Sequence, residues 1–251
     1  VGVDKLSYDR IKKKDITVTN SKLINTESIF NLIVLYLLDT TKKLLINKEH
    51  YKNRFEYEKI FLNTCDLTKQ KILILGYGNV AKKIQKFSIF SKLNIKIFSR
   101  RNNIIKKNKE IFVSLRRMNG TINQYDTIIN LLPNNRFNKN FLNKKIFLRL
   151  KKNVSLILVG RLETVDLENL CVFLRKNKNS SCYIDAVTNV GNAKIFNQIK
   201  RLKNTFVSPH IGGYSHSYWI NQLNLFNLNL NLFKRNKKMV NIVKISKHNF
   251  S

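Results

Sequence analysis

A glycine-rich turn directly after an apolar run is the feature of this chain that points most clearly to chemistry. The run Lys71–Leu75 is followed by Gly76-Tyr77-Gly78-Asn79-Val80-Ala81, which has the pattern Gly-x-Gly-x-x-Ala. Gly76 permits a tight turn, Gly78 lets the backbone approach a phosphate, and the small Ala81 lets a helix pack on a strand. A helix predicted over residues 79–88 would direct its first N–H groups at an anion. The pattern predicts a site for the pyrophosphate of a dinucleotide.

Two arginines indicate which dinucleotide is preferred. The second predicted strand, residues 95–98, ends in Ser99-Arg100-Arg101, where an NAD-binding protein normally carries an acid that binds the ribose hydroxyls. Cations at this place favour a 2′-phosphate, so NADP is the preferred cofactor and NAD the second choice. The alternative is a solvated pair in a very basic chain; the sequence leaves both readings open.

Short apolar runs alternate with helical stretches after residue 70, which predicts an α/β fold with a doubly wound parallel sheet. Before it we expect a short strand at 16–19 and a helix at 25–45, capped by Asn25 or Thr26, with Glu27 in its first turn. A basic connector at 47–59 follows this helix. The last helix, from 218 to about 235, carries Leu225, Leu228 and Leu232 on one predicted buried face. The expected strands of the sheet are 71–75, 95–98, 127–132, 155–159, 183–187 and 205–208.

Composition restricts the class of protein. The 251 residues, 43% of them hydrophobic, can form a full core, and the formal net charge is +32. Such a charge can indicate a polyanion partner, but lysine is scattered among asparagine, isoleucine and phenylalanine, as an AT-rich coding sequence would give. Nucleic acid is therefore the less favoured partner.

Cysteines and terminal features add further expectations. Cys65, Cys171 and Cys182 are widely spaced, so neither a metal site nor a disulfide framework is predicted. No signal segment opens the chain, and the run at 29–38 is too short to span a bilayer, so we expect a cytoplasmic protein without a membrane partner. The first residue is Val1, and we expect that an upstream part is missing.

Four more motifs follow the glycine-rich turn in a fixed order. One strand ends in Leu132-Pro133, the next in Gly160-Arg161, and a third contains Ile184-Asp185; a turn Ser208-Pro209-His210-Ile211-Gly212-Gly213 follows the last. Together they resemble the D-isomer-specific 2-hydroxyacid dehydrogenase family, and within it the glyoxylate and hydroxypyruvate reductases. The similarity runs from Gly2-Val3-Asp4 to the C-terminal helix and so covers nearly the whole chain.

The resemblance implies a role for each matched residue. His210 matches the proton donor and acceptor, and Arg161 the arginine that binds the substrate carboxylate and polarises its carbonyl. Asp185 matches a carboxylate near the nicotinamide carboxamide. The cofactor contacts implied are Gly76, Tyr77, Gly78, Asn79, Val80, Ser99, Arg100, Arg101, Leu132, Pro133, Asn138, Val159, Asp185 and Gly212.

The chain departs from the family pattern at several positions. Val190 stands where the family has the glutamate that pairs with the histidine, and an adjacent anion is what favours the imidazolium. Leu158, Leu162 and Phe30-Asn31 also differ, and the first part of the family's substrate domain, with a loop that grips the carboxylate, has no counterpart. These differences make turnover the weakest part of the resemblance.

The resemblance implies a Rossmann domain at 53–208, inserted in a partial flavodoxin-like substrate domain made of 1–52 and 209–251. The predicted function is hydride transfer between NAD(P) and C2 of a small 2-oxo or 2-hydroxy acid, by a homodimer. The alternative is a catalytically weak NAD(P)-binding protein that senses cofactor or binds a partner, including a polyanion.

Overall fold

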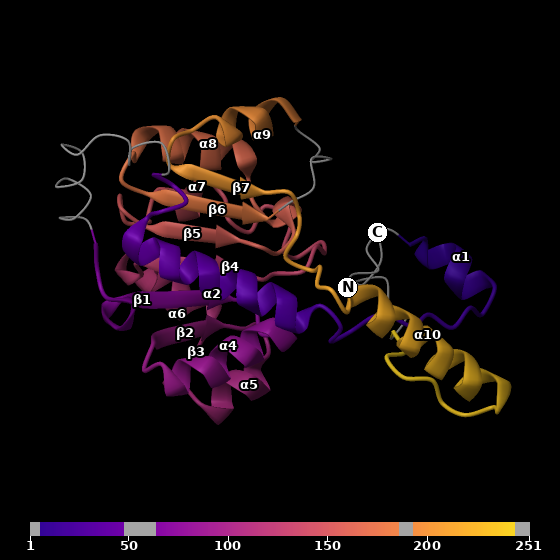
Figure 1. The fold of residues 1–251 in the computed structure, drawn as a ribbon. Helices are drawn as coiled ribbons and strands as arrows, with labels where there is room; N and C mark the ends of the chain where they lie inside the picture. Colours follow the sequence, from indigo (N-terminus) through magenta and orange to yellow (C-terminus); the bar gives the residue numbers. More distant parts are fainter. Residues whose placement is uncertain (1–5, 48–63, 186–192, 244–251) are drawn as a thin grey trace.

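The computed structural model describes residues 6–47, 64–185 and 193–243. Within them, one seven-stranded parallel sheet has the order β3-β2-β1-β4-β5-β6-β7 (Figure 1). This arrangement confirms the predicted doubly wound α/β fold, and the strand order reverses direction between β1 and β4, where such sheets bind ligands. The strands are β1 Lys71–Leu75, β2 Asn94–Phe98, β3 Phe112–Val113, β4 Thr127–Asn130, β5 Ser155–Leu158, β6 Ser181–Asp185 and β7 Thr205–Ser208.

Helices cover both faces of the sheet because its strands are apolar on both sides. Ile72 and Ile74 of β1 belong to one buried cluster, and Leu73 and Leu75 to the other. The first cluster includes buried residues of α2 and α4, and the second includes residues of α6, α7, α8 and α9. These helices are α2 Thr26–Lys42, α4 Asn79–Phe90, α5 Asn102–Lys107, α6 Leu115–Thr121, α7 Lys144–Phe147, α8 Leu167–Lys176 and α9 Ala193–Lys200, with short 3-10 turns at Leu67–Lys69, Ile122–Gln124 and Leu162–Thr164.

Helix α2 packs directly on the sheet although it precedes β1 by a long connection. Ile33, Tyr36 and Leu37 are buried in the same cluster as Ile72 and Ile74, and Figure 1 shows α2 lying across the strands. Asn25 occupies the predicted N-cap position, but its side chain makes no capping hydrogen bond. Helix α2 thus connects the segment that precedes it to the seven-stranded sheet.

Two further helices, α1 Tyr8–Lys13 and α10 Tyr218–Lys234, lie together to one side of the sheet (Figure 1). The strand predicted at 16–19 is wrong, since only Thr19 pairs, in a single antiparallel bridge with Ile242. Backbone bonds from Asn20 to the Asn241 carbonyl and from Val243 to the Val18 carbonyl flank it. Among the described residues this segment has one short neighbour, and no ladder extends along it there.

The prediction of a buried leucine face on α10 is also wrong. Leu228 is 48% exposed, and among the residues of this helix only Asn229 is buried. The Asn229 side chain donates to the Val240 carbonyl and accepts from the Val240 N–H. Trp219, at the start of the helix, is 72% exposed. Helix α10 rests on short segments, and these are too small to cover a whole helix face.

Smaller differences concern the ends of elements. The sequence did not predict β3 or α1, each too short to show a period. The strands predicted to end at 132 and 159 end at Asn130 and Leu158. The connector at 47–59 lies almost entirely outside the described residues, as do Val1 and the other residues of the amino terminus.

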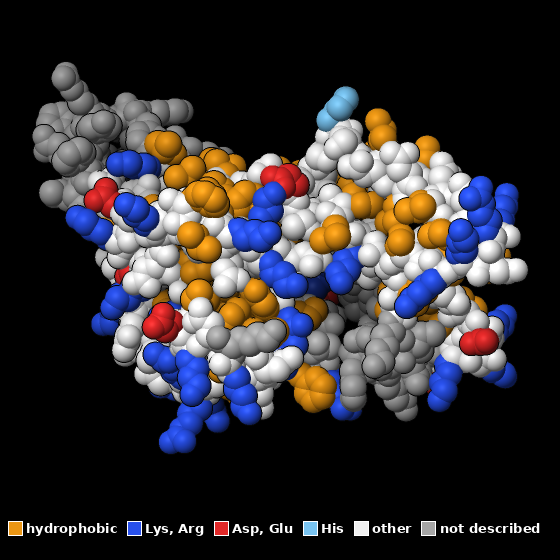
Figure 2. All heavy atoms as spheres, turned by 90° about the horizontal axis from the view of Figure 1, so that it is seen from below, with side chains coloured by type: hydrophobic (Ala, Val, Ile, Leu, Met, Phe, Trp, Pro, Cys, Tyr) orange, Lys and Arg blue, Asp and Glu red, His pale blue; other side chains and the backbone are white. Residues whose placement is uncertain are grey.

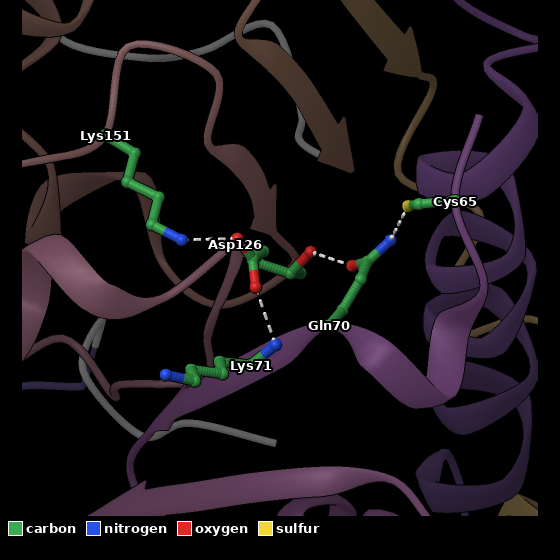
Figure 3. Close-up of polar contacts among 6 residues, drawn as sticks. Cys65, Gln70, Lys71, Asp126 and Lys151 are labelled. Carbon is green, nitrogen blue, oxygen red and sulfur yellow. Dashed lines mark hydrogen bonds and ion pairs between the residues drawn. The ribbon is translucent and has the colours of Figure 1, made fainter. Parts of the chain in front are cut away.

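The amino-terminal ends of β1 and β4 are closed by polar contacts (Figure 3). Asp126 accepts the Lys71 backbone N–H at 2.8 Å and pairs with Lys151 at 2.5 Å. The Gln70 amide accepts from Thr127 at 2.7 Å and donates to the Cys65 sulfur at 3.2 Å. These groups satisfy one another, which leaves the opposite, carboxyl-terminal ends of the strands for a ligand.

Candidate cofactor and catalytic site

The glycine loop, residues 76–80, has the backbone that a bound pyrophosphate requires. Gly76 has φ +100°, and a Cβ added there would lie 3.2 Å from the Leu131 carbonyl oxygen; only glycine adopts this conformation without strain. Gly78 caps α4, and a Cβ built on it would meet no atom within 4 Å. No capping side chain accepts a hydrogen bond from the first N–H groups of α4. Ala81 is fully buried, as predicted. The backbone of the glycine loop can therefore accommodate a bound anion.

Arg100 and Arg101 follow β2 and reach to either side of that strand end. The Arg101 guanidinium donates to the Tyr77 carbonyl at 2.6 Å, and so it lies against the glycine loop. The Arg100 guanidinium donates to the Phe137 carbonyl at 2.5 Å and lies over the Phe137 and Phe141 rings. Burial lowers the pKa of Arg100, which still stays charged at neutral pH. The two cations thus lie at the end of β2, Arg101 against the glycine loop and Arg100 against the loop after β4.

The loop after β4 contributes one unsatisfied buried acceptor. Asn138 is 4% exposed, and its amide donates to the Pro133 carbonyl at 2.9 Å. Its Oδ1 atom is buried and has no hydrogen-bond partner among the described residues. An N–H or O–H of a bound cofactor would satisfy it. Leu132 is buried and packs near Gly76.

Gly160 lets the ends of β4 and β5 approach each other. A Cβ added at Gly160 would lie 2.9 Å from the Asn130 carbonyl oxygen and 3.1 Å from that of Leu132. The Gly160 N–H donates to the same Asn130 carbonyl at 3.0 Å. Arg161 follows directly and begins a 3-10 turn. The close approach therefore fixes where the backbone of Arg161 leaves the sheet.

The Gly160→Ala substitution is expected to lower the free energy of unfolding by about 2 kcal/mol, because a backbone carbonyl cannot move aside cheaply. Urea denaturation measures this loss. Gly120→Ala is the matched control: Gly120 lies in α6, and nothing lies within 4 Å of the added Cβ, so stability should be unchanged or rise by up to about 1 kcal/mol. Equal losses in both variants would contradict the close-approach argument.

The turn at residues 208–213, hereafter the His210 turn, is held by one carboxylate. Asp185 ends β6 beside Ser208 of β7 and is 5% exposed. Its Oδ1 atom accepts the Ile211 N–H at 2.9 Å and the Ser208 hydroxyl at 2.5 Å; its Oδ2 atom accepts the Gly212 N–H at 2.8 Å. His210 itself has φ +58°, a left-handed conformation that costs a non-glycine residue about 1 kcal/mol. Three hydrogen bonds to Asp185 offset that cost.

Gly212 is required by this arrangement. A Cβ there would lie 2.7 Å from Asp185 Oδ2 and 2.8 Å from Leu32 Cδ2. The Asp185 carboxylate therefore packs directly against the backbone of the His210 turn. Since a carboxylate has about four lone-pair sites and accepts three bonds here, Asp185 can still accept one from a cofactor amide.

Comparisons with known proteins agree with this geometry. Residues 34–212 match the sequence model of the D-isomer specific 2-hydroxyacid dehydrogenase NAD binding domain. The chain therefore belongs to the D-isomer specific 2-hydroxyacid dehydrogenase family. A human glyoxylate reductase/hydroxypyruvate reductase is 26% identical over 222 residues, which are 86% of this chain and 66% of that protein. This chain thus corresponds to slightly less than two thirds of its relative.

Solved structures of other dehydrogenases share the fold. The apo D-mandelate dehydrogenase of Rhodotorula graminis superposes with a TM-score of 0.84 at 13% identity, over 100% of this chain and 75% of that one. An NADPH-dependent glyoxylate/hydroxypyruvate reductase of Sinorhizobium meliloti, in complex with NADP and malonate, gives 0.78 at 19% identity, over 99% and 77%. This family member therefore has the family's fold.

One departure from the family pattern concerns the partner of His210. Val190, which replaces the family's glutamate, lies in residues 186–192, outside the described residues. The Nδ1 atom of His210 is buried and has no hydrogen-bond partner within residues 6–47, 64–185 and 193–243. The described part of this dehydrogenase-family chain thus supplies no substitute for the glutamate.

The sequence did not single out the residues that connect α2 to the His210 turn. The Asn25 side chain lies 2.9 Å from where a Gly213 Cβ would be, and its Oδ1 atom is buried without a partner among the described residues. Ser28 donates to the Tyr214 carbonyl at 2.5 Å. Both residues stand at the predicted start of the helix, and that local signal gave no indication of their contact with the His210 turn.

Lysine and arginine side chains are dispersed on one face of the molecule (Figure 2). Figure 2 shows lysine and arginine spread across the face seen from below rather than collected in one patch. The described residues contain no group of three or more His, Cys, Asp or Glu that could hold a metal ion. Over the same residues, no helix combines the length and apolar character needed to cross a membrane.

Proposed function

We propose that this chain is the major part of an NADP-preferring oxidoreductase that transfers hydride between nicotinamide and C2 of a small 2-oxo or 2-hydroxy acid. The observation that carries the proposal is the His210 turn, held by Asp185 on the same sheet edge as the glycine loop. Four strand spacings separate β1 from β7, about 19 Å. The nicotinamide half of a dinucleotide whose pyrophosphate binds the glycine loop would extend along this edge toward the His210 turn.

The cofactor would lie with its pyrophosphate on the N-terminus of α4, at Asn79 and Val80, and its adenosine between Arg101 and the loop after β4. Leu132, Pro133 and Asn138 would line the adenosine, and Val159 the nicotinamide side. When bound, NADP supplies or accepts the hydride. The Arg100 and Arg101 guanidinium groups support the preference for a 2′-phosphate. Ser99 would belong to the same phosphate site, because its hydroxyl accepts the Arg101 backbone N–H at 3.2 Å.

His210 and Arg161 would act on the substrate. The His210 imidazole donates a proton to the carbonyl oxygen in reduction and removes it from the hydroxyl in oxidation. The Arg161 guanidinium binds the carboxylate in a bidentate manner and thereby fixes the orientation of C2. Asp185 holds the His210 turn and accepts from the nicotinamide amide with its remaining lone pair. We assign these roles to the residues that match the family's motifs.

Turnover by the full-length protein tests the proposal. NADPH oxidation is followed with glyoxylate, hydroxypyruvate and pyruvate, and repeated with NADH. We expect reduction of at least one acid, with a higher kcat/KM for NADPH than for NADH. Cofactor binding without any turnover would contradict the proposal and favour the second candidate function, a catalytically weak NAD(P)-binding protein, for which Val190 is the supporting observation.

The polyanion form of that second candidate has its own test. Retention on DNA should fall steeply with salt concentration if many phosphates are neutralised. The dispersed charge in Figure 2 predicts a shallow dependence instead. The homodimer, the domain boundaries and the cytoplasmic location stay predictions.

A further inference from the structure

The His210 turn is connected to α2 through a buried tyrosine. The Tyr36 hydroxyl donates to Ser208 Oγ at 2.7 Å, and Ser208 Oγ donates to Asp185 Oδ1 at 2.5 Å. Asp185 in turn accepts the Ile211 and Gly212 N–H groups. An unbroken series of hydrogen bonds thus runs from a helix on one face of the sheet to the backbone beside His210.

The register of β6 and β7 places Asp185 and Ser208 on the face of the sheet that α2 covers. Asp185 and Ser208 are paired neighbours at the ends of β6 and β7. Two residues earlier on each strand, Tyr183 and Phe206 point to the same face and hold the Tyr36 ring, at 5.2 Å in a stacked and 6.1 Å in an edge contact. Tyr36 is completely buried. The ring is fixed, and so its hydroxyl points at Ser208.

Donor and acceptor roles follow from the protonation state of Tyr36. Burial raises the pKa of Tyr36 to about 12, with the Ser208 hydrogen bond opposing and the Asp185 charge adding to this rise. The phenol therefore keeps its proton at every physiological pH and acts as donor. Since Ser208 Oγ accepts from Tyr36, its single hydrogen is free for Asp185.

We propose that Tyr36, acting through Ser208 and Asp185, is a positioning residue that holds the His210 turn for proton transfer. The inference rests on the function proposed above for His210. The left-handed backbone of His210 persists only where its surroundings over-determine it. Asp185 accepts the Ile211 and Gly212 N–H groups on either side of its carboxylate, and a carboxylate can rotate about its own χ2. The Tyr36 series fixes one of its oxygens and so fixes the plane of the carboxylate.

Tyr36→Phe tests the proposal with Tyr183→Phe as its matched control. Both side chains are fully buried and stack on each other, but the Tyr183 hydroxyl donates to Asp39 of α2, at 2.8 Å, rather than to the turn. Each variant loses one buried hydroxyl from the same pair of stacked tyrosines. Only Tyr36→Phe removes the series that reaches Ser208.

Two readouts separate positioning from general stability. Amide hydrogen exchange of Ile211 and Gly212, measured by NMR, should accelerate about tenfold in Tyr36→Phe and change less than about twofold in Tyr183→Phe. In parallel, kcat should fall about tenfold in Tyr36→Phe with the Kd of NADPH within about twofold. Ser208→Thr, which keeps the hydroxyl, should retain both properties, and Ser208→Ala should lose them.

Equal exchange at these two amides in both tyrosine variants would overturn the proposal. A loss of NADPH affinity as large as the loss in kcat would overturn it too, because that pattern indicates general loosening. If the wild-type protein reduces none of the acids, the proposed function fails, and the exchange comparison still decides whether Tyr36 holds the turn.

Discussion

His210→Asn is expected to lower kcat at least about 100-fold while the Kd of NADPH stays within about twofold, because loss of a general acid costs a factor of about 10² to 10⁴. Asparagine is chosen since it tolerates the left-handed φ of +58° found at this position. The Asp185 bonds to Ile211 and Gly212 should therefore survive. Stopped-flow or steady-state kinetics measure kcat, and cofactor fluorescence measures the Kd of NADPH.

His216→Asn provides the control for this substitution. His216 is exposed and lies after the same turn, and so its replacement should leave kcat unchanged. If His210→Asn retained more than a third of the wild-type kcat, His210 would not be the proton donor. Solvent or another residue would then have to supply the proton.

Replacing both Arg100 and Arg101 by alanine is expected to raise the Kd of NADPH about 100-fold and that of NADH less than about threefold. A charge-assisted hydrogen bond to phosphate contributes about 1.5 to 3 kcal/mol, and NADH carries no 2′-phosphate to lose it. Isothermal titration with each cofactor measures the difference. The double variant Arg175→Ala/Lys176→Ala, in the last turn of α8, removes the same number of positive charges away from the end of β2 and should change neither Kd.

The single variants can separate the two arginines. Arg101 also donates to the Tyr77 carbonyl of the glycine loop, and so Arg101→Ala should weaken both cofactors slightly through the loop. Arg100 contacts Phe137 and Phe141 instead, and Arg100→Ala should act on NADPH alone. Equal losses for NADPH and NADH in the double variant would remove the case for NADP.

The sequence predicted those parts of the fold that depend on local pattern. Apolar runs ended by glycine, such as Lys71–Leu75 before Gly76, identified buried strands, and β1 has those bounds. The prediction failed at Ile16 to Thr19 and on the leucine face of α10, because local periodicity does not specify which neighbour covers a segment. Two-residue β3 has no period at all.

Part of the candidate site could likewise be predicted from local sequence, and part of it could not. Residue type and order alone indicated a dinucleotide loop at Gly76 and Gly78, a turn at His210 and an arginine at 161, since each is a short contiguous motif. Only the tertiary structure showed that Tyr36, Ser208 and Asp185 form one series of hydrogen bonds, which joins residues 172 positions apart in the chain. Side chains that distant meet through the packing of α2 on β6 and β7, a contact that no local pattern encodes.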